Sequence, residues 1–250
     1  MKTGIKNIVL IAFLIILTAP LWAQSEKRTS SRIPLLNEDA PSFTAESTNG
    51  TISFPRDYGS KWKILFSHPG DFTPVCTTEL LELAQMQQDF KELNVALAVV
   101  SVNSLYLHEQ WVKSMENILN KDPESKPVKI NFPLIDDSKF SIGWKYGMLT
   151  PSHESFKAVR GVFIIDPDNK IQAVTFYPMN VGRSMAEIKR MVIALQTAEK
   201  NAVLIPADWK PGEDVLLPNP ESVDYYDSNN PEQTGLYDVA GYLLYKKLNK

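Results

Sequence analysis

Cysteine is almost absent from this chain: among 250 residues there is one, Cys76. A single cysteine excludes an intrachain disulfide and every cysteine-rich zinc site. Histidine is nearly as rare, and the three histidines, His68, His108 and His153, lie about 40 residues apart. That spacing matches no metal-ligand motif. We therefore expect a protein that works without a bound metal or other cofactor.

An excess of positive charge is also missing. The chain has 26 Lys and Arg against 29 Asp and Glu, a net charge of −3 at pH 7. Nucleic-acid binding that ignores sequence needs clustered Lys and Arg, so we expect no nucleic-acid partner. Hydrophobic residues make up 44% of the chain and charged residues 22%. These are ordinary globular values, and they exclude a wholly disordered or fibrous protein.

Long apolar runs are confined to the first two dozen residues. Lys2 and Lys6 precede a nearly unbroken apolar stretch over 8–19, and polarity returns after Ala23. This layout predicts a secretory signal peptide, residues 1–23, cleaved after Ala23. The alternative is an uncleaved N-terminal anchor, although the run is shorter than the roughly 20 residues that a membrane span needs. We predict an exported protein, periplasmic or secreted, with no stable membrane span.

The remainder of the chain alternates between strand and helix patterns. Residues 24–38 form a polar tail, 39–202 carry the alternation, and 203–250 form a C-terminal extension that we expect to pack across the core or onto another subunit. Strands are predicted over 43–54 (a hairpin around Asn49-Gly50), 61–66, 95–102, 131–135, 159–165 and 171–176, and helices from Thr73 onward and over 104–119, 140–148 and 184–200. The alternation predicts an α/β layered fold with its functional groups in loops beyond strand ends.

Chemically useful residues gather between 67 and 79, where a strand gives way to a helix. Thr73 suits the N-cap and Pro74 the first helical position, which places Cys76 in the first turn. Unpaired N–H groups and the positive end of the helix dipole stabilise a thiolate there. The pattern leaves two interpretations open, a reactive thiol or a buried inert cysteine. Cys76-Thr77-Thr78-Glu79 is not a C-x-x-C redox pair.

The run Pro69-Gly70-Asp71-Phe72-Thr73-Pro74-Val75-Cys76-Thr77-Thr78-Glu79 resembles the active-site signature of the peroxiredoxins. The flanking Leu65-Phe66-Ser67-His68 and the later Pro206-Ala207-Asp208-Trp209-Lys210-Pro211-Gly212 resemble the one-cysteine, peroxiredoxin 6-like group. The likeness extends from about Pro41 to Leu217. It implies a thioredoxin-like fold, with a central mixed sheet flanked by helices. It also implies thiol-dependent reduction of hydrogen peroxide and organic hydroperoxides.

The resemblance also implies roles for individual residues. Cys76 would attack the peroxide and become a sulfenic acid. Thr73 would contact the peroxide and the sulfur, and Pro69 would shield the sulfur from water. Arg160, at the start of a later strand, matches the family arginine that holds the thiolate and polarises the peroxide, a role that suits a guanidinium.

Weaker candidates each have a plainer alternative. His68 belongs to the segment that lines the pocket in the one-cysteine group, but a histidine that merely orders the loop would look the same. Arg183 matches a second family arginine, and its alternative is a solvated charge at a helix start. Glu79 matches a position that orients the arginine, although an exposed first-turn carboxylate would fit equally. Asp136 and Asp137 are expected to form a turn and a helix cap.

Departures from the family pattern narrow the expected function. Ile205 stands where typical two-cysteine relatives have a resolving cysteine, so an external thiol or another small reductant must recycle the sulfenic acid. The stretch Gly59-Ser60-Lys61-Trp62-Lys63 lacks the central serine and closing glycine of the phospholipase motif of some relatives, so we expect no lipase activity. The resemblance favours a homodimer. The alternatives to a peroxidase are a non-catalytic binding or holdase-type module and a disulfide exchanger.

Overall fold

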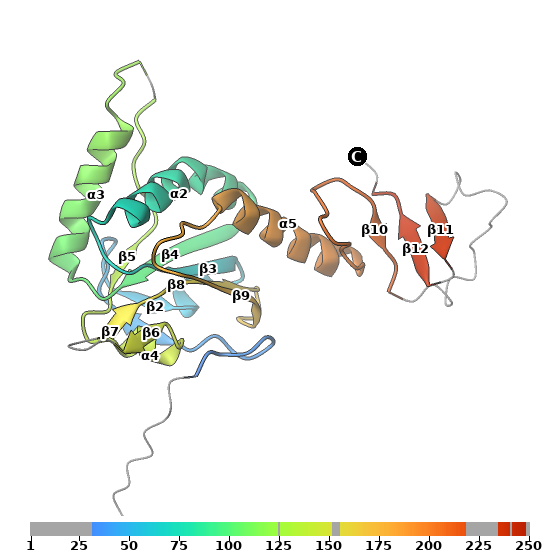
Figure 1. The fold of residues 1–250 in the computed structure, drawn as a ribbon, viewed down its shortest axis with the longest axis horizontal. Helices are drawn as coiled ribbons and strands as arrows, with labels where there is room; N and C mark the ends of the chain where they lie inside the picture. Colours follow the sequence, from blue (N-terminus) through green and yellow to red (C-terminus); the bar gives the residue numbers. More distant parts are fainter. Residues whose placement is uncertain (1–31, 125, 152–155, 219–234, 241, 249–250) are drawn as a thin grey trace, which may run out of the picture. The chain divides into compact units, whose positions relative to one another are not determined.

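A five-stranded mixed sheet, in the order β5-β4-β3-β8-β9, forms the centre of the fold (Figure 1). β3, β4 and β5 are parallel, and β8 runs antiparallel to both of its neighbours, β3 and β9. The strands are β3 (Trp62–Ser67), β4 (Val95–Ser101), β5 (Leu134–Asp136), β8 (Arg160–Ile165) and β9 (Ile171–Tyr177). The sheet and its helices confirm the expected thioredoxin-like α/β fold.

This computed structural model describes residues 32–124, 126–151, 156–218, 235–240 and 242–248. The predicted signal peptide, residues 1–23, lies outside the described residues, as do His153 and the first part of the polar tail.

Period-two alternation along the strands produces two apolar clusters, one on each face of the sheet. Ile64 and Phe66 point to a cluster shared with Trp111 and Val192, whereas Leu65 points to one shared with Phe163. The first face is covered by α2 (Pro74–Glu92), α3 (Leu105–Leu119) and α5 (Met185–Asn201). The opposite face is covered by the hairpin of β1 (Phe43–Ala45) and β2 (Ile52–Phe54), together with α4 (Ser141–Lys145) (Figure 1). Full burial of each large apolar side chain contributes about 1.5–3 kcal/mol.

Two of the predicted elements are shorter than the sequence pattern suggested. The helix expected over 140–148 is α4 alone, because Gly147 adopts a left-handed φ of 64° and the Met148 amide turns back to the Gly143 carbonyl. The strand expected over 131–135 begins at Leu134. Pro133 precedes it and has no N–H for the ladder, although its carbonyl accepts from the Val99 amide.

Two small sheets were not predicted. One pairs β6 (Leu149–Pro151) with β7 (Phe156–Ala158), and the other joins β10 (Val215–Leu216), β12 (Leu243–Lys246) and β11 (Leu236–Ala240) within the C-terminal extension. The extension is tied to α5, since Trp209 and Val215 pack with Ala194 and the Arg190 Nη1 donates to the Trp209 carbonyl at 2.9 Å. The short 3₁₀ helix η1 (Arg56–Tyr58) completes the fold.

Candidate active site

The loop between β3 and α2 carries the predicted active-site residues. Thr73 is the N-cap of α2 and Pro74 its first residue, as predicted, but the Thr73 hydroxyl makes no capping bond. It donates instead to the Gly70 carbonyl at 2.9 Å. Phe72, just before the helix, has a left-handed φ of 56°, a strained conformation for a bulky residue. The first-turn N–H groups of α2 therefore face the site without a side-chain cap.

Cys76 lies in the first turn of α2, and its side chain is fully buried. The Arg160 Nη1 lies 3.2 Å from its sulfur. Arg160 is itself buried and is fixed at its other nitrogens, because Nε and Nη2 both donate to the Met179 carbonyl, at 3.2 and 2.7 Å. An inert core cysteine has apolar neighbours, whereas a guanidinium at this distance stabilises a thiolate. The geometry therefore favours the reactive interpretation of this buried cysteine.

Glu79, one turn further along α2, joins the two arginines of the site. Its Oε2 accepts from Arg160 Nη1 and from Arg183 Nη2, each at 2.8 Å, and its Oε1 accepts from the Arg183 amide and Nε. Arg183 Nη1 continues to the carbonyls of Ser67 and Gly161. Glu79 and Arg183 are thus neither an exposed carboxylate nor a solvated charge. The structure brings both into one buried cluster with Arg160 and Cys76.

The charged side chains around Cys76 carry a net positive charge. Burial opposes ionisation of Glu79, but the hydrogen bonds and positive charge of Arg183, assisted by Arg160, outweigh it and lower the pKa of the carboxyl. Two guanidinium groups and one carboxylate leave one positive charge over. An uncompensated buried charge is costly, so the site favours a negative group beside the Arg160 guanidinium.

Asp71 lies in the same loop and anchors it to the sheet and to α3. Its carboxylate, fully buried, meets His68 Nε2 at 2.9 Å and His108 Nδ1 at 2.7 Å. The other nitrogen of His108, Nε2, lies 3.1 Å from the Ile135 carbonyl oxygen. His108 therefore links the Asp71 loop to β5. His108 was overlooked in the sequence because 40 residues separate it from His68.

His68 is the second histidine that contacts the Asp71 carboxylate. Burial, the largest effect, lowers the pKa of its imidazole against the opposing effect of Asp71, so the ring is neutral at pH 7. Nε2–H then donates to Asp71, and among the described residues nothing partners the buried Nδ1. Burial also opposes ionisation of Asp71, but hydrogen bonds from His108 and His68 outweigh it and lower the pKa of the carboxyl.

These shifts predict a protein that loses stability on acidification. The folded-state pKa of His68 lies below its ordinary value of 6.5, so the unfolded chain takes up the proton first and stability falls as pH drops below 6.5. The lowered pKa values of Glu79 and Asp71 also make the folded protein less stable as pH falls, below their ordinary pKa values of 4.5 and 3.8. Each group changes the free energy of unfolding by at most about 1.4 kcal/mol per pH unit. Urea unfolding at pH 7, 6 and 5 measures the effect.

His68→Gln keeps a side-chain N–H donor for Asp71 and removes the titrating ring. We expect this variant to show a flatter dependence of unfolding free energy on pH between 7 and 5. A wild-type protein that becomes more stable on acidification across this range would contradict the assignment.

The other residues that the sequence singled out lie beside Cys76 or at the starts of helices. Pro69 and Thr73 are half-buried beside the fully buried Cys76. Asp136 forms a turn, as expected, because it accepts from the Ser138 amide, and it also accepts from the Leu105 amide at the start of α3. Asp137 lies before α4 and accepts from the Ile142 and Gly143 amides of its first turn, although the N-cap position itself is Phe140.

The positions that depart from the family pattern have structural contacts of their own. Ile205 packs against the cluster of Val203, Trp209 and Val215. Lys63, where the phospholipase motif would close with glycine, is buried and donates to the Asn169 Oδ1 at 2.7 Å and the Asp166 carbonyl at 3.1 Å. Ile205 and Lys63 therefore each have a structural role, the first in apolar packing and the second in buried hydrogen bonds.

No group of three or more His, Cys, Asp and Glu side chains within the described ranges is arranged to hold a metal ion. No helix in the same ranges combines the length and the apolar character that crossing a membrane requires.

Comparison with known proteins agrees with this site. The AhpC/TSA family model matches residues 36–174, and the model for the C-terminal domain of 1-Cys peroxiredoxin matches residues 194–227. The chain belongs to the peroxiredoxins. A peroxiredoxin from Methanosarcina mazei is 48% identical over 77% of this chain and 87% of its own. The mitochondrial peroxiredoxin of Saccharomyces cerevisiae is 37% identical over 83% of this chain and 79% of its own.

Solved structures place this peroxiredoxin in the one-cysteine group. The yeast mitochondrial 1-Cys peroxiredoxin, studied for thiol resolution through glutathione and thioredoxin systems, matches with a TM-score of 0.75 and 36% identity, covering 86% of this chain and 100% of its own. A cysteine-to-serine variant of peroxiredoxin 6 from Arenicola marina matches with a TM-score of 0.75 and 32% identity, covering 86% of this chain and 99% of its own. The protein is a thiol-dependent peroxidase with a single cysteine, and the holdase-type alternative is disfavoured.

Proposed function

We propose that Cys76 reduces peroxides by direct attack of its thiolate. The sulfur forms a bond to one peroxide oxygen, the O–O bond breaks, and the departing oxygen takes up a proton and leaves as water or alcohol. Cys76 becomes a sulfenic acid. The 3.2 Å contact from Arg160 Nη1 to the sulfur carries the proposal, because this guanidinium can hold the thiolate and stabilise charge on the departing oxygen.

Other residues of the loop position the reactants. The uncapped first-turn amides of α2 and the Thr73 hydroxyl, which can rotate away from the Gly70 carbonyl, offer donors to a peroxide beside the sulfur. Pro69 limits the access of water, and Glu79 with Arg183 keeps Arg160 in place. His68 lies directly before Pro69, with its buried Nδ1 free to accept a hydrogen bond from a bound hydroperoxide.

An external thiol completes the cycle. The chain has one cysteine, and the resolving position holds Ile205. One reductant thiol attacks the sulfenic sulfur and releases water, and a second thiol breaks the mixed disulfide to restore Cys76. We propose a reductant of the glutathione or thioredoxin class, since the yeast relative is resolved through those systems.

Mass spectrometry in single-turnover mode tests the reaction. Reduced protein mixed with one equivalent of peroxide should gain one oxygen atom at Cys76 orders of magnitude faster than free cysteine does. The Cys76→Ser protein should gain none. Oxidation no faster than that of free cysteine would contradict the peroxidase and favour the non-catalytic binding module. Rapid formation of mixed disulfides with oxidised glutathione, together with a slow reaction with peroxide, would indicate a disulfide exchanger.

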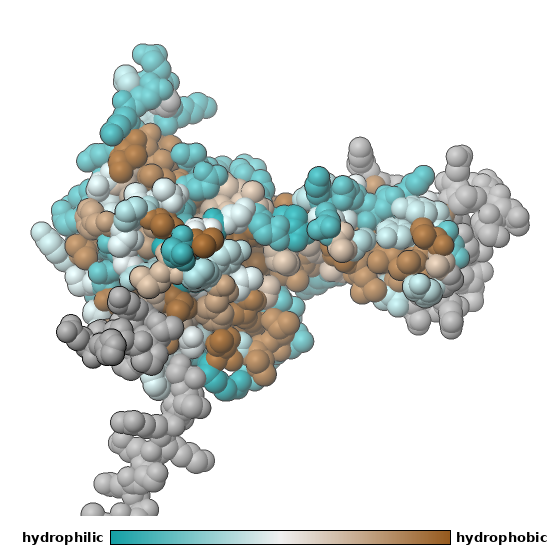
Figure 2. Space-filling model, in the orientation of Figure 1, coloured by the Kyte–Doolittle hydropathy of each residue, from teal (hydrophilic) through white to brown (hydrophobic). Residues whose placement is uncertain are grey.

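We propose that the protein is a homodimer joined at the edge of its sheet. β9 pairs with β8 alone within the five-stranded sheet, and residues 37–40 cover only the start of its other side. Exposed apolar residues follow along and after this strand, namely Phe176, Met179 and Val181. Apolar side chains gather over this end of the core (Figure 2). An uncovered apolar edge strand favours pairing with a second copy. A monomeric mass by light scattering at micromolar concentration would contradict the dimer.

We propose that the chain is exported after removal of residues 1–23. Two lysines ahead of an apolar run support this proposal. N-terminal sequencing of the protein recovered from a bacterial periplasm should begin at Gln24, and a start at Met1 in a membrane fraction would indicate the anchor instead.

A further inference from the structure

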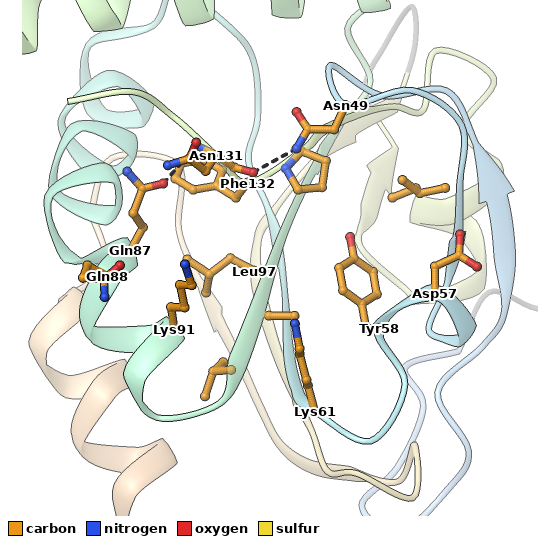
Figure 3. A pocket seen from close by; sticks show the side chains of 14 residues that line it. Asn49, Asp57, Tyr58, Lys61, Gln87, Gln88, Lys91, Leu97, Asn131 and Phe132 are labelled. Carbon is orange, nitrogen blue, oxygen red and sulfur yellow. Dashed lines mark hydrogen bonds between the residues drawn. The ribbon is translucent and has the colours of Figure 1, made fainter. Parts of the chain in front are cut away.

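A cavity of about 580 Å³ opens beside the first residues of β4 (Figure 3). Its size is that of sites for small molecules, about 300–1,000 Å³. Its lining includes Lys91, near the end of α2, whereas Cys76 is in the first turn of that helix. At 1.5 Å per residue the two positions are about 22 Å apart along the helix. The cavity is therefore separate from the peroxide site.

Three polar groups in this cavity have no partner among the described residues. The Lys61 and Lys91 side chains are exposed, and neither ammonium group makes a hydrogen bond or ion pair there. The Tyr58 hydroxyl is buried and also unpartnered. In Figure 3 the tips of all three side chains point toward the rim formed by Asn49 and Asn131. Burial, aided by the nearby Asp57, raises the pKa of Tyr58 to about 12, so this hydroxyl is a donor at neutral pH.

The polar groups of the rim, in contrast, are satisfied. The Asn49 Nδ2 donates to the Asn131 carbonyl at 2.9 Å, and the Asn131 amide donates to Gln87 Oε1 at 2.9 Å. Asp57 is the one carboxylate of the lining, and its Oδ2 accepts from the Ser53 amide at 2.6 Å. The unsatisfied groups of the cavity are thus donors, two of them charged.

The floor of the cavity adds a backbone donor. β5 pairs with β4 only from Val99 onward. The residues of β4 before Val99 therefore have no strand beside them on the edge that faces β5. The Val99 amide points to that side, toward the Pro133 carbonyl. Backbone groups alternate along a strand, so Leu97, two residues earlier, directs its N–H the same way. Leu97, Phe132 and Pro133 also provide an apolar wall.

We propose that this cavity binds a small organic anion, whose phosphate or carboxylate group lies between Lys61 and Lys91 and whose apolar body rests against Phe132 and Pro133. The Tyr58 hydroxyl and the Leu97 amide donate to its remaining oxygens. Such a ligand supplies the acceptors and the negative charge that the lining lacks. The proposal does not depend on the peroxidase activity.

Isothermal titration calorimetry on the full chain tests this site. The probes are adenosine monophosphate, benzoate and neutral adenosine, so the first two distinguish a phosphate from a carboxylate ligand that carries an apolar ring. At least one anion should bind with a Kd below about 1 mM, and adenosine should bind at least tenfold more weakly than adenosine monophosphate if the phosphate ester is the ligand. The double variant Lys61→Gln/Lys91→Gln should weaken the binding anion at least tenfold, and Tyr58→Phe should weaken it about fivefold.

Lys113→Gln is the matched control, because Lys113 is an exposed lysine of α3 outside the lining. It should leave affinity unchanged. Failure of both anions to bind at millimolar concentration overturns the proposal. Binding that survives in the double variant also overturns it, since the anion would then occupy another surface. Unchanged thermal unfolding of the variants shows that any loss of binding is local.

Discussion

Replacement of Arg160 by Met should lower the rate of Cys76 oxidation by hydrogen peroxide about 10³-fold. Met keeps an unbranched side chain in the buried site but removes the nitrogen 3.2 Å from the sulfur. The thiolate then loses its nearest positive charge, and the departing oxygen loses its stabilising donor. Stopped-flow rates with quenched samples analysed by mass would measure the loss.

Arg56→Met is the matched control, because Arg56 is highly exposed and, within the described part of the chain, pairs only with its neighbour Asp57. This variant should oxidise at the wild-type rate. If Arg160→Met stays folded and reacts within threefold of wild type, the guanidinium has no part in the chemistry, and the uncapped amides of α2 must activate the sulfur without it.

Replacement of Glu79 by Gln should reduce the free energy of unfolding by about 3–5 kcal/mol. The carboxylate accepts four hydrogen bonds from Arg160 and Arg183, and all three side chains are buried. A neutral amide leaves two buried guanidinium groups without the carboxylate that pairs with both of them. Urea denaturation at pH 7 measures the change.

Glu82→Gln is the corresponding control, since Glu82 lies on the same helix but is exposed. It should alter stability by less than about 0.5 kcal/mol. The Glu79 variant should also oxidise more slowly at Cys76, because Arg160 loses one of its anchors. A Glu79→Gln protein as stable as Glu82→Gln would show that the buried cluster tolerates the extra positive charge.

Local patterns were sufficient to predict most of the fold. Thr73 and Pro74 mark the start of α2, and the buried strand over 95–102 appears as β4 (Val95–Ser101). Such features are encoded within a few residues. The ends of α4 and β5 were misplaced because a left-handed Gly147 and the imino nitrogen of Pro133 outweighed the apolar pattern. The C-terminal sheet was overlooked because its strands are short and interrupted.

The site was harder to predict than the fold. The first-turn placement of Cys76 followed from spacing, but Arg160 is 84 residues away and was identified only through the family resemblance. Asp71 lay inside the signature and still gave no sign of its role, because its partner His108 comes from α3, 37 residues further along the chain. Long-range side-chain contacts of this kind have no sequence period. The cavity beside the first residues of β4 likewise depends on where β5 begins to pair with β4, and the sequence of a single strand does not specify that register.

The charge balance around Cys76 has a further consequence once the enzyme has turned over. A sulfenic acid is neutral, so the two guanidinium groups and Glu79 again carry one uncompensated positive charge. A second peroxide converts the sulfur to a sulfinate, an anion that restores the balance. An arrangement that favours a thiolate at Cys76 therefore also favours its irreversibly inactivated form. With Ile205 at the resolving position, survival of the enzyme depends on how quickly a reductant arrives.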